Sequence, residues 1–249
     1  MNFEKFAPFF DESWHSKIKP FIESKECDEI YKVLKEQSGR GKLIAPSSFN
    51  TFRVFKEVPL NDINVIVLGY CPYHSFYQGS PVADGIGFSC SITGKLQPSL
   101  ETMYRGLEID LYDGLNLDYY KSPDLTYMLK QGIFLLNSSL TVLKDKAGSH
   151  QELWRPFTEY LFKEVFAYSG IPTIFIGKDA SFYERYVTPL THGPIFKCEH
   201  PAAAAARERR DWETNKVFSN VTNLVKQNNG INLEWLMSQE QIDLQNIPF

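Results

Sequence analysis

The chain has 249 residues, of which 43% are hydrophobic and 14% aromatic, enough for the core of one large domain or two small ones. Its formal net charge of −4 gives no overall signal for nucleic-acid binding, although a local basic patch could still bind DNA. No run of 18 apolar residues occurs, which excludes a membrane-spanning helix of the usual length.

The cysteines and the first residues indicate where the protein works. Cys27, Cys71, Cys90 and Cys198 are widely spaced and form no CxxC pair, so they predict reduced thiols and no zinc site. Residues 1–5 lack the basic and apolar regions of a secretory signal. We therefore expect a cytoplasmic protein.

Apolar runs and helical spacings alternate along the chain. In chain order, the predicted elements are helices within residues 1–45, a strand at 65–68, an extended piece at 88–91, a helix at 98–106, a strand at 132–137, an amphipathic helix at 152–168, a strand at 172–177, a helix start at 182–187, a strand at 195–198 and a helix at 215–227. Strands that alternate with helices favour an α/β fold with a parallel sheet.

Polar residues follow three of the four predicted strands. Residues 70–74 follow the first strand, Asn137 ends the second and His200 comes just after the fourth. Parallel strands place their carboxyl ends at one edge of the sheet, where the ligand sites of open α/β sheets lie. The topology therefore predicts one pocket that gathers a thiol, phenols, an amide and imidazoles.

Four segments around these strand ends match the motifs of one known family in the same order. Residues 69–74, Gly-Tyr-Cys-Pro-Tyr-His, are similar to a water-activating Gly-Gln-Asp-Pro-Tyr-His loop. Residues 85–89 resemble Gly-Leu-x-Phe-Ser, residues 134–142 resemble Leu-Leu-Leu-Asn-x-x-Leu-Thr-Val, and residues 200–205 resemble His-Pro-Ser-Pro-Leu-Ser. On these motifs the chain resembles family-1 uracil-DNA glycosylase.

The resemblance implies a three-layer α/β fold with a central four-stranded parallel sheet flanked by helices, in one domain over residues 1–249. It implies a monofunctional DNA glycosylase, active as a monomer, that flips a pyrimidine nucleotide out of single- or double-stranded DNA and hydrolyses its glycosidic bond. It implies no metal ion and no cofactor. Because the base leaves as an anion from a cationic sugar, the site must stabilise both charges.

The resemblance also assigns roles to five pocket residues. By carry-over, Phe88 stacks on the flipped base, Asn137 reads its Watson–Crick edge and His200 hydrogen-bonds the charge that develops on O2. Tyr73 crowds the C5 edge and rejects a methyl group, and His74 supports the loop. Taken singly, each has a plainer interpretation, such as a core aromatic, a turn former or a loop histidine. Only the ordered set favours a base pocket.

Position 71 departs from the family pattern. Cys71 stands where the family has the carboxylate that orients water and stabilises the sugar cation. A thiol, with an ordinary pKa of about 8.5, is mostly neutral at neutral pH and suits neither task. Three interpretations stay open: the chain is slow or inactive on uracil, Asp84 in the same loop supplies another catalytic carboxylate, or Cys71 acts as a nucleophile.

Two further changes lie at the base pocket. Tyr70, a candidate base contact, replaces the family's Gln, and the loop between residues 74 and 88 is longer than usual. These changes favour a modified pyrimidine, such as those of phage DNA, with a role in phage defence or DNA repair, whereas Tyr73 argues for plain uracil. A non-catalytic module that binds DNA or a protein is the competing interpretation, which Cys71 favours and the retained pocket residues oppose.

The surface expected to face DNA differs as well. Alanines at 202, 204 and 205 stand where the family has phosphate-binding serines and an intercalating leucine, and Ala204 is too small to fill the gap left by a flipped base. Nearby arginines could grip phosphate instead, although a solvated helix start explains them equally well. The candidate DNA contacts are Pro46, Ser149, Lys178, Arg207, Arg209 and Arg210.

Overall fold

A four-stranded parallel sheet forms the centre of the molecule. In the computed structural model, which describes residues 1–114, 119–206 and 212–238, the strand order is β6-β2-β8-β9 and all neighbouring pairs are parallel. The strands are β2 (Val65–Gly69), β6 (Ile133–Asn137), β8 (Thr173–Ile176) and β9 (Ile195–Cys198). The four strands predicted from the sequence are confirmed.

The apolar character of the central strands follows from burial on both faces. All five residues of β2 are buried, because β6 and β8 pair with it on either side and helices cover both faces. Leu68 lies between Leu136 of β6 and Phe175 of β8, and Gly69 pairs with Asn137. The polar end of β6 therefore lies directly beside the loop that follows β2.

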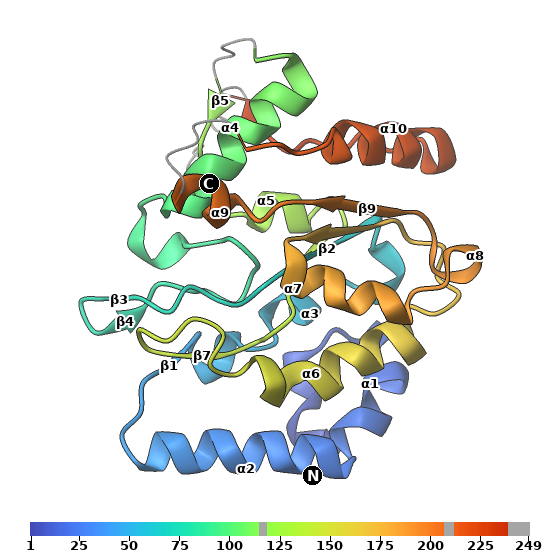
Figure 1. Ribbon diagram of the computed structural model, residues 1–249. Helices are drawn as coiled ribbons and strands as arrows, with labels where there is room; N and C mark the ends of the chain where they lie inside the picture. The colour runs from blue at the N-terminus through green and yellow to red at the C-terminus, as the bar shows by residue number, and fades with distance from the viewer. Residues whose placement is uncertain (115–118, 207–211, 239–249) are drawn as a thin grey trace, which may run out of the picture.

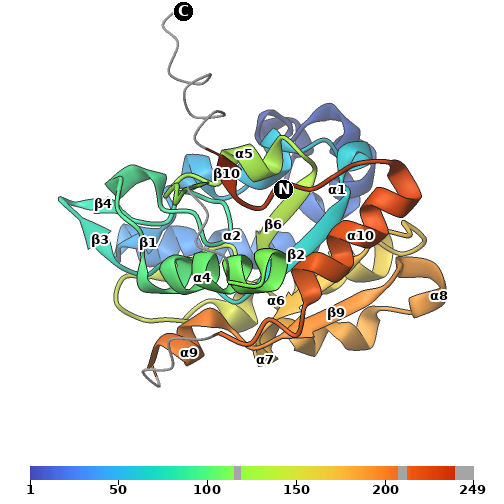
Figure 2. The same ribbon diagram turned by 90° about the horizontal axis from the view of Figure 1, so that it is seen from above.

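Helices cover the sheet in a three-layer α/β arrangement, which confirms the predicted fold class. Figure 1 shows α4 (Pro98–Tyr112) and α10 (Val217–Asn229) above the sheet, with α1 (His15–Ile22), α2 (Lys25–Gly39) and α6 (Gln151–Tyr160) below it. Seen from above, α10 lies beside β9 (Figure 2). Within the described ranges, no helix is both long and apolar enough to cross a membrane.

Short elements make up much of the rest of the described chain. The short α-helices are α3 (Arg53–Glu57), α5 (Thr126–Leu129), α7 (Lys178–Ser181), α8 (Pro189–His192) and α9 (Pro201–Ala206). Small antiparallel pairs join β1 (Ile44–Ala45) to β7 (Val142–Leu143), β3 (Phe76–Tyr77) to β4 (Ser80–Pro81), and β5 (Tyr119–Tyr120) to β10 (Met237–Ser238). Turns of 3-10 helix occupy Phe3–Lys5, Ala7–Phe9, Glu12–Trp14, Ser48–Asn50, Leu60–Asp62, Ser91–Thr93 and Phe182–Tyr186.

Two predicted helix boundaries differ in the structure. The helix predicted at 152–168 is α-helical only to Tyr160 and continues as a π-helix over Leu161–Val165. The last predicted helix begins at Val217 instead of residue 215. Asn215 and Lys216 have φ angles of 56° and 55°, which no regular right-handed helix contains.

Candidate active site

A cavity of about 180 Å³ lies at the carboxyl ends of β2 and β6. Its walls come from the loop after β2, residues 83–89, the end of β6 and the residues after β9. The structure brings seven of the predicted site residues together at the sheet edge that a parallel topology favours for ligands. These residues are Tyr70, Cys71, Tyr73, His74, Phe88, Asn137 and His200.

Phe88 forms part of the cavity wall from an uncommon backbone conformation. Its φ of +65° lies in the left-handed region, so the extended piece predicted at 88–91 is wrong. Tyr73 Oη donates to the Phe88 carbonyl at 3.0 Å and lies 3.0 Å from Ser99 Oγ. Burial raises the pKa of Tyr73, so the phenol stays a neutral donor. These two contacts fix the position of the Tyr73 ring in the wall.

Gly69 lets two pocket side chains approach the end of β2 at once. A Cβ added at Gly69 would lie 3.1 Å from Asn137 Oδ1 and 3.2 Å from the nearest carbon of the Phe88 ring. Contacts this short are tighter than ordinary packing, so a larger residue would displace the amide or the ring. The glycine that opens the loop motif therefore has a packing role in the pocket.

His200 lines the cavity as a neutral imidazole. Its Nδ1 accepts a hydrogen bond from the Ala202 backbone N–H at 3.2 Å, which leaves the ring proton on Nε2. Burial lowers the pKa of His200 to about 4, against a slight opposing effect from the charge of Asp179. The ring lies 5.6 Å from the Phe88 ring. His200 can thus donate one hydrogen bond from Nε2 without carrying a positive charge.

The low pKa of His200 predicts a distinctive pH dependence. Neutral His200 is retained from pH 8 down to about 5, so the reaction rate is expected to show no inflection near the ordinary histidine pKa of 6.5.

The stability of the fold is expected to depend on pH as well. His150 is buried, and its pKa, like that of His200, is lowered to about 4. Both pKa values lie below that of the unfolded chain, so the folded state loses stability as the pH falls from 6.5 towards 4. Chemical denaturation at several pH values measures this loss, and stability that rises over the same interval would contradict it.

Tyr70 and Cys71 lie against the turn at Gly148. A Cβ at Gly148 would come 1.8 Å from the Tyr70 hydroxyl, so only glycine fits beneath this ring. Burial raises the pKa of Cys71 to about 11, although a hydrogen bond from the Gly148 backbone opposes the shift. A thiol with this pKa is protonated at neutral pH. A raised pKa therefore does not favour Cys71 as a nucleophile.

His74 lines the same cavity next to Tyr73. Its backbone carbonyl accepts a hydrogen bond from the Asp145 backbone N–H at 3.0 Å, which ties the loop after β2 to the turn after β7. Its Nδ1 is buried, and no described residue offers it a hydrogen-bond partner. The hydrogen bond to the His74 carbonyl is consistent with the predicted loop-supporting role.

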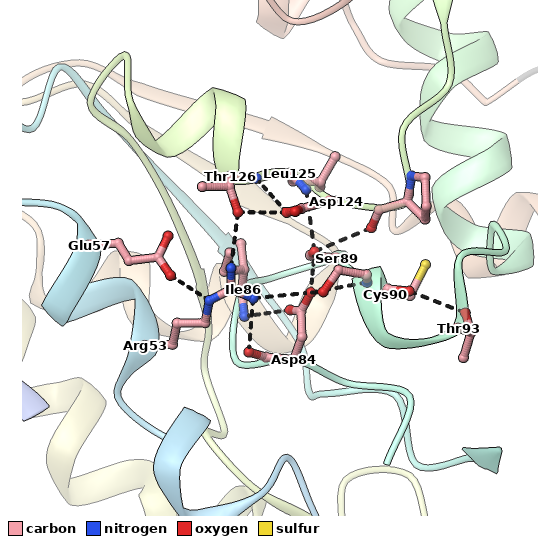
Figure 3. Close-up of polar contacts among 12 residues, drawn as sticks. Arg53, Glu57, Asp84, Ile86, Ser89, Cys90, Thr93, Asp124, Leu125 and Thr126 are labelled. Carbon is pink, nitrogen blue, oxygen red and sulfur yellow. Dashed lines mark hydrogen bonds and ion pairs between the residues drawn. The ribbon is translucent and has the colours of Figure 1, made fainter. Parts of the chain in front are cut away.

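Asp84 does not supply a catalytic carboxylate, and the structure corrects that expectation. Its side chain is fully buried, and it is not among the residues that line the cavity. One oxygen accepts from the Ile86 N–H at 3.1 Å, and the other accepts from Ser89 Oγ at 2.6 Å and from Ser91 N at 3.1 Å and Oγ at 2.5 Å. Arg53 forms an ion pair with the second oxygen at 3.4 Å. Figure 3 shows Ile86, Ser89 and Arg53 around the carboxylate.

The Asp84 network holds the loop that carries Phe88. Replacing Asp84 with alanine is expected to lower the free energy of unfolding by about 3 kcal/mol, because it leaves buried donors and the Arg53 charge unpaired. Urea denaturation measures the change. Asp62→Ala is the matched control, since Asp62 is exposed and its loss is expected to cost less than about 0.5 kcal/mol. Equal stabilities of the two variants would contradict this assignment.

Comparison with known proteins places the chain in a family. No protein-family model matches it. A uracil-DNA glycosylase from Acinetobacter baylyi is 33% identical over 228 residues, which cover 90% of this chain and 92% of the relative. One from Caenorhabditis elegans is 30% identical over 231 residues, covering 90% of this chain and 77% of the relative.

The chain belongs to the uracil-DNA glycosylase family. This confirms the resemblance drawn from the motif order. Because only about one residue in three is identical to the Acinetobacter baylyi relative, the chain is a divergent member. Solved structures agree at the level of the fold. A substituted mimivirus UNG in complex with UGI aligns with a TM-score of 0.80 over 94% of this chain and 91% of that one, at 21% identity. A UNG from Nitratifractor salsuginis aligns with a TM-score of 0.59 at 18% identity.

The DNA contacts expected from the glycosylase family have mixed outcomes. Lys178 begins α7 and Ser149 follows Gly148, and both are exposed, so both are open to a phosphate. Pro46 is buried, which corrects its assignment as a DNA contact. Ala204 is also buried and cannot act as a wedge. The arginines at 207, 209 and 210 lie outside the described residues.

Sequence reasoning missed two residues near the cavity. Ser99, at the start of α4, contacts Tyr73 from 26 positions away, a separation that no motif encodes. Asp179, on the short helix α7, is the acid whose charge acts on Tyr70, Cys71 and His200. Among the residues that the structure describes, no group of three or more His, Cys, Asp or Glu could hold a metal ion.

Proposed function

We propose that this chain is a DNA glycosylase that removes uracil from DNA by hydrolysis and leaves an abasic site. Family membership supports a hydrolase that acts on N-glycosidic bonds, with DNA as its partner. The observation that carries the proposal is the convergence of Phe88, Asn137 and a neutral His200 on one small cavity. We further propose that one copy of the chain suffices and that no metal ion takes part.

The pocket chemistry fits an extruded uracil. Phe88 offers an aromatic face for stacking, as enzymes that flip bases require. The Asn137 amide has an NH2 group that can donate to O4 of uracil and a carbonyl oxygen that can accept from N3–H. His200 donates from Nε2 to O2, where negative charge grows as the base departs. Cytosine presents the opposite donor and acceptor pattern at the same edge, so a fixed amide disfavours it.

Unmodified uracil fits better than a pyrimidine with a group at C5. Tyr73, proposed to face C5, is tethered by contacts to Phe88 and Ser99 and cannot swing away without breaking them. The loop between residues 74 and 88 contains the β3–β4 hairpin, which turns at Gln78 and Gly79 with φ angles of 49° and 84°. Figures 1 and 2 show this hairpin projecting away from the sheet, and none of its strand residues lines the cavity.

A panel of base-modified duplexes tests the proposal. Single-turnover reactions on DNA containing uracil, thymine, 5-hydroxymethyluracil or cytosine, followed by alkali cleavage of abasic sites, give one rate for each base. Uracil is expected to be the fastest substrate. Faster release of 5-hydroxymethyluracil would instead support the specialised phage-DNA role, and release of no base would support the non-catalytic binding module.

A further inference from the structure

The proposed reaction, on which this inference rests, requires a negative charge that the cavity lining does not provide. Breaking the bond between C1′ and N1 leaves a cationic sugar, which needs a counter-charge. None of the described residues that line the cavity is an aspartate or a glutamate. Cys71 is no substitute, because its thiol is protonated at neutral pH. An acid just outside the lining can supply this counter-charge.

The short helix that carries Asp179 starts next to His200. Strand β8 ends at Ile176, and the next residue, Gly177, packs so closely that an added Cβ would lie 2.8 Å from His200 Cβ. Helix α7 begins immediately afterwards and is tied to the Gly177 carbonyl, which accepts from Ser181 N at 3.0 Å and Oγ at 2.9 Å. Asp179 is the second residue of this helix, which also contacts β2.

The charge of Asp179 reaches both sides of the cavity. Burial is the main cause of the raised pKa values of Tyr70 and Cys71, and the negative charge of Asp179 adds to both. The same charge opposes the lowering of the pKa of His200. Tyr70 and Cys71 follow β2, whereas His200 follows β9. Strand β8 lies between these two strands and leads directly into α7, so the helix that carries Asp179 starts between the two sides of the cavity.

Asp179 also differs from Asp84 in being unengaged. Within the described ranges, no hydrogen bond or ion pair involves its carboxylate, whereas four donors and Arg53 hold Asp84. Asp179 is half-buried, so it is partly shielded from water but open to a substrate. A carboxylate in this setting interacts with a developing cation more strongly than a fully solvated one.

We propose that Asp179 is a catalytic residue that supplies the counter-charge for the sugar cation, in place of a carboxylate at position 71. As the C1′–N1 bond breaks, its electron pair leaves with uracil, and the carboxylate stabilises the positive charge on the sugar. A water oxygen then bonds to C1′ and gives up one proton, first to Asp179 and then through solvent to the uracil anion. The net reaction adds one water across the bond.

Four proteins test this assignment on one uracil-containing duplex under single-turnover conditions: the unaltered chain, Asp179→Asn, Cys71→Asp and the double variant. Asp179→Asn is expected to slow the unaltered chain by about 100-fold, a size typical of losing one group that stabilises transition-state charge. In the Cys71→Asp background the same change is expected to cost less than about 10-fold, because the carboxylate at position 71 then supplies the charge.

The controls separate chemistry from folding. Asp62→Asn removes the same charge near the amino end of β2, at the edge remote from the cavity, and is expected to keep the full rate. Asp179→Glu keeps the charge and is expected to retain activity, and melting temperatures show whether each variant folds. An unchanged rate in Asp179→Asn would overturn the inference, and so would an equal loss in both backgrounds, which indicates a structural role.

The outcome for position 71 distinguishes this inference from the proposed function. If Cys71→Asp is active on uracil and the unaltered chain is inactive, the pocket accepts uracil but lacks a working counter-charge. That result would overturn the role of Asp179 and leave the proposed pocket standing. Silence of both proteins on uracil would overturn the proposed function itself.

Discussion

Replacing His200 with alanine is expected to lower the single-turnover rate of the proposed uracil excision by about 100-fold, because the leaving base would lose the neutral donor proposed to stabilise its charge. The structure fixes this donor by three features. The Ala202 N–H occupies Nδ1, burial lowers the pKa of His200 to about 4, and the ring lies on Gly177. Rates on a uracil-containing duplex at saturating enzyme measure the effect.

A second substitution at the same position checks the mechanism. His200→Gln replaces the imidazole with an uncharged amide donor and is expected to recover part of the rate that His200→Ala loses. If alanine and glutamine behave alike, or if alanine keeps the full rate, donation from Nε2 is not part of the reaction.

Replacing Cys71 with aspartate is expected to raise the rate of the proposed reaction by about 100-fold. The change places a carboxylate in the loop after β2, where it can accept a proton from water and face the sugar cation. Burial works against ionisation at this site, as the raised pKa of Cys71 shows, but the Gly148 N–H is in place to hydrogen-bond the carboxylate. Single-turnover rates from pH 5 to pH 9 measure both the gain and the pKa of the new group.

Cys71→Ser serves as the matched control for this gain. It changes the size and polarity of the side chain without adding a charge, so it is expected to stay within a few-fold of the unaltered rate. No gain from aspartate, or an equal gain from serine, would contradict the expectation that a carboxylate at position 71 speeds the reaction.

The sequence was sufficient to predict the sheet and the position of the pocket. Four apolar runs separated by helical spacings fixed a parallel α/β topology, and the polar residues after three of the strands had to meet at one edge. The segment from Phe134 to Asn137 illustrates both the sheet and the pocket, since its apolar residues belong to β6 and its last residue lines the cavity. Motif order then identified the family without any use of geometry.

The remaining features of the site could not be predicted, because they depend on contacts between residues far apart in the sequence. Asp84 looked like a spare catalytic acid because its loop carries the pocket, but its partners include Arg53, 31 positions earlier. Phe88 was expected to be extended, whereas its backbone is held left-handed next to the Tyr73 hydroxyl. Asp179 belongs to no recognisable pattern, and only the closeness of β8 to β2 and β9 brings it to the site.

A crystal structure of the protein with free uracil tests the central claim most directly, because it examines the pocket apart from any reaction rate. We expect the base to stack on Phe88, with O2 within hydrogen-bond distance of His200 Nε2 and with N3 and O4 facing the Asn137 amide. The C5 edge is expected to touch the Tyr73 ring. Uracil bound elsewhere, or bound with C5 facing open solvent, would contradict the assignment of this cavity as a uracil site.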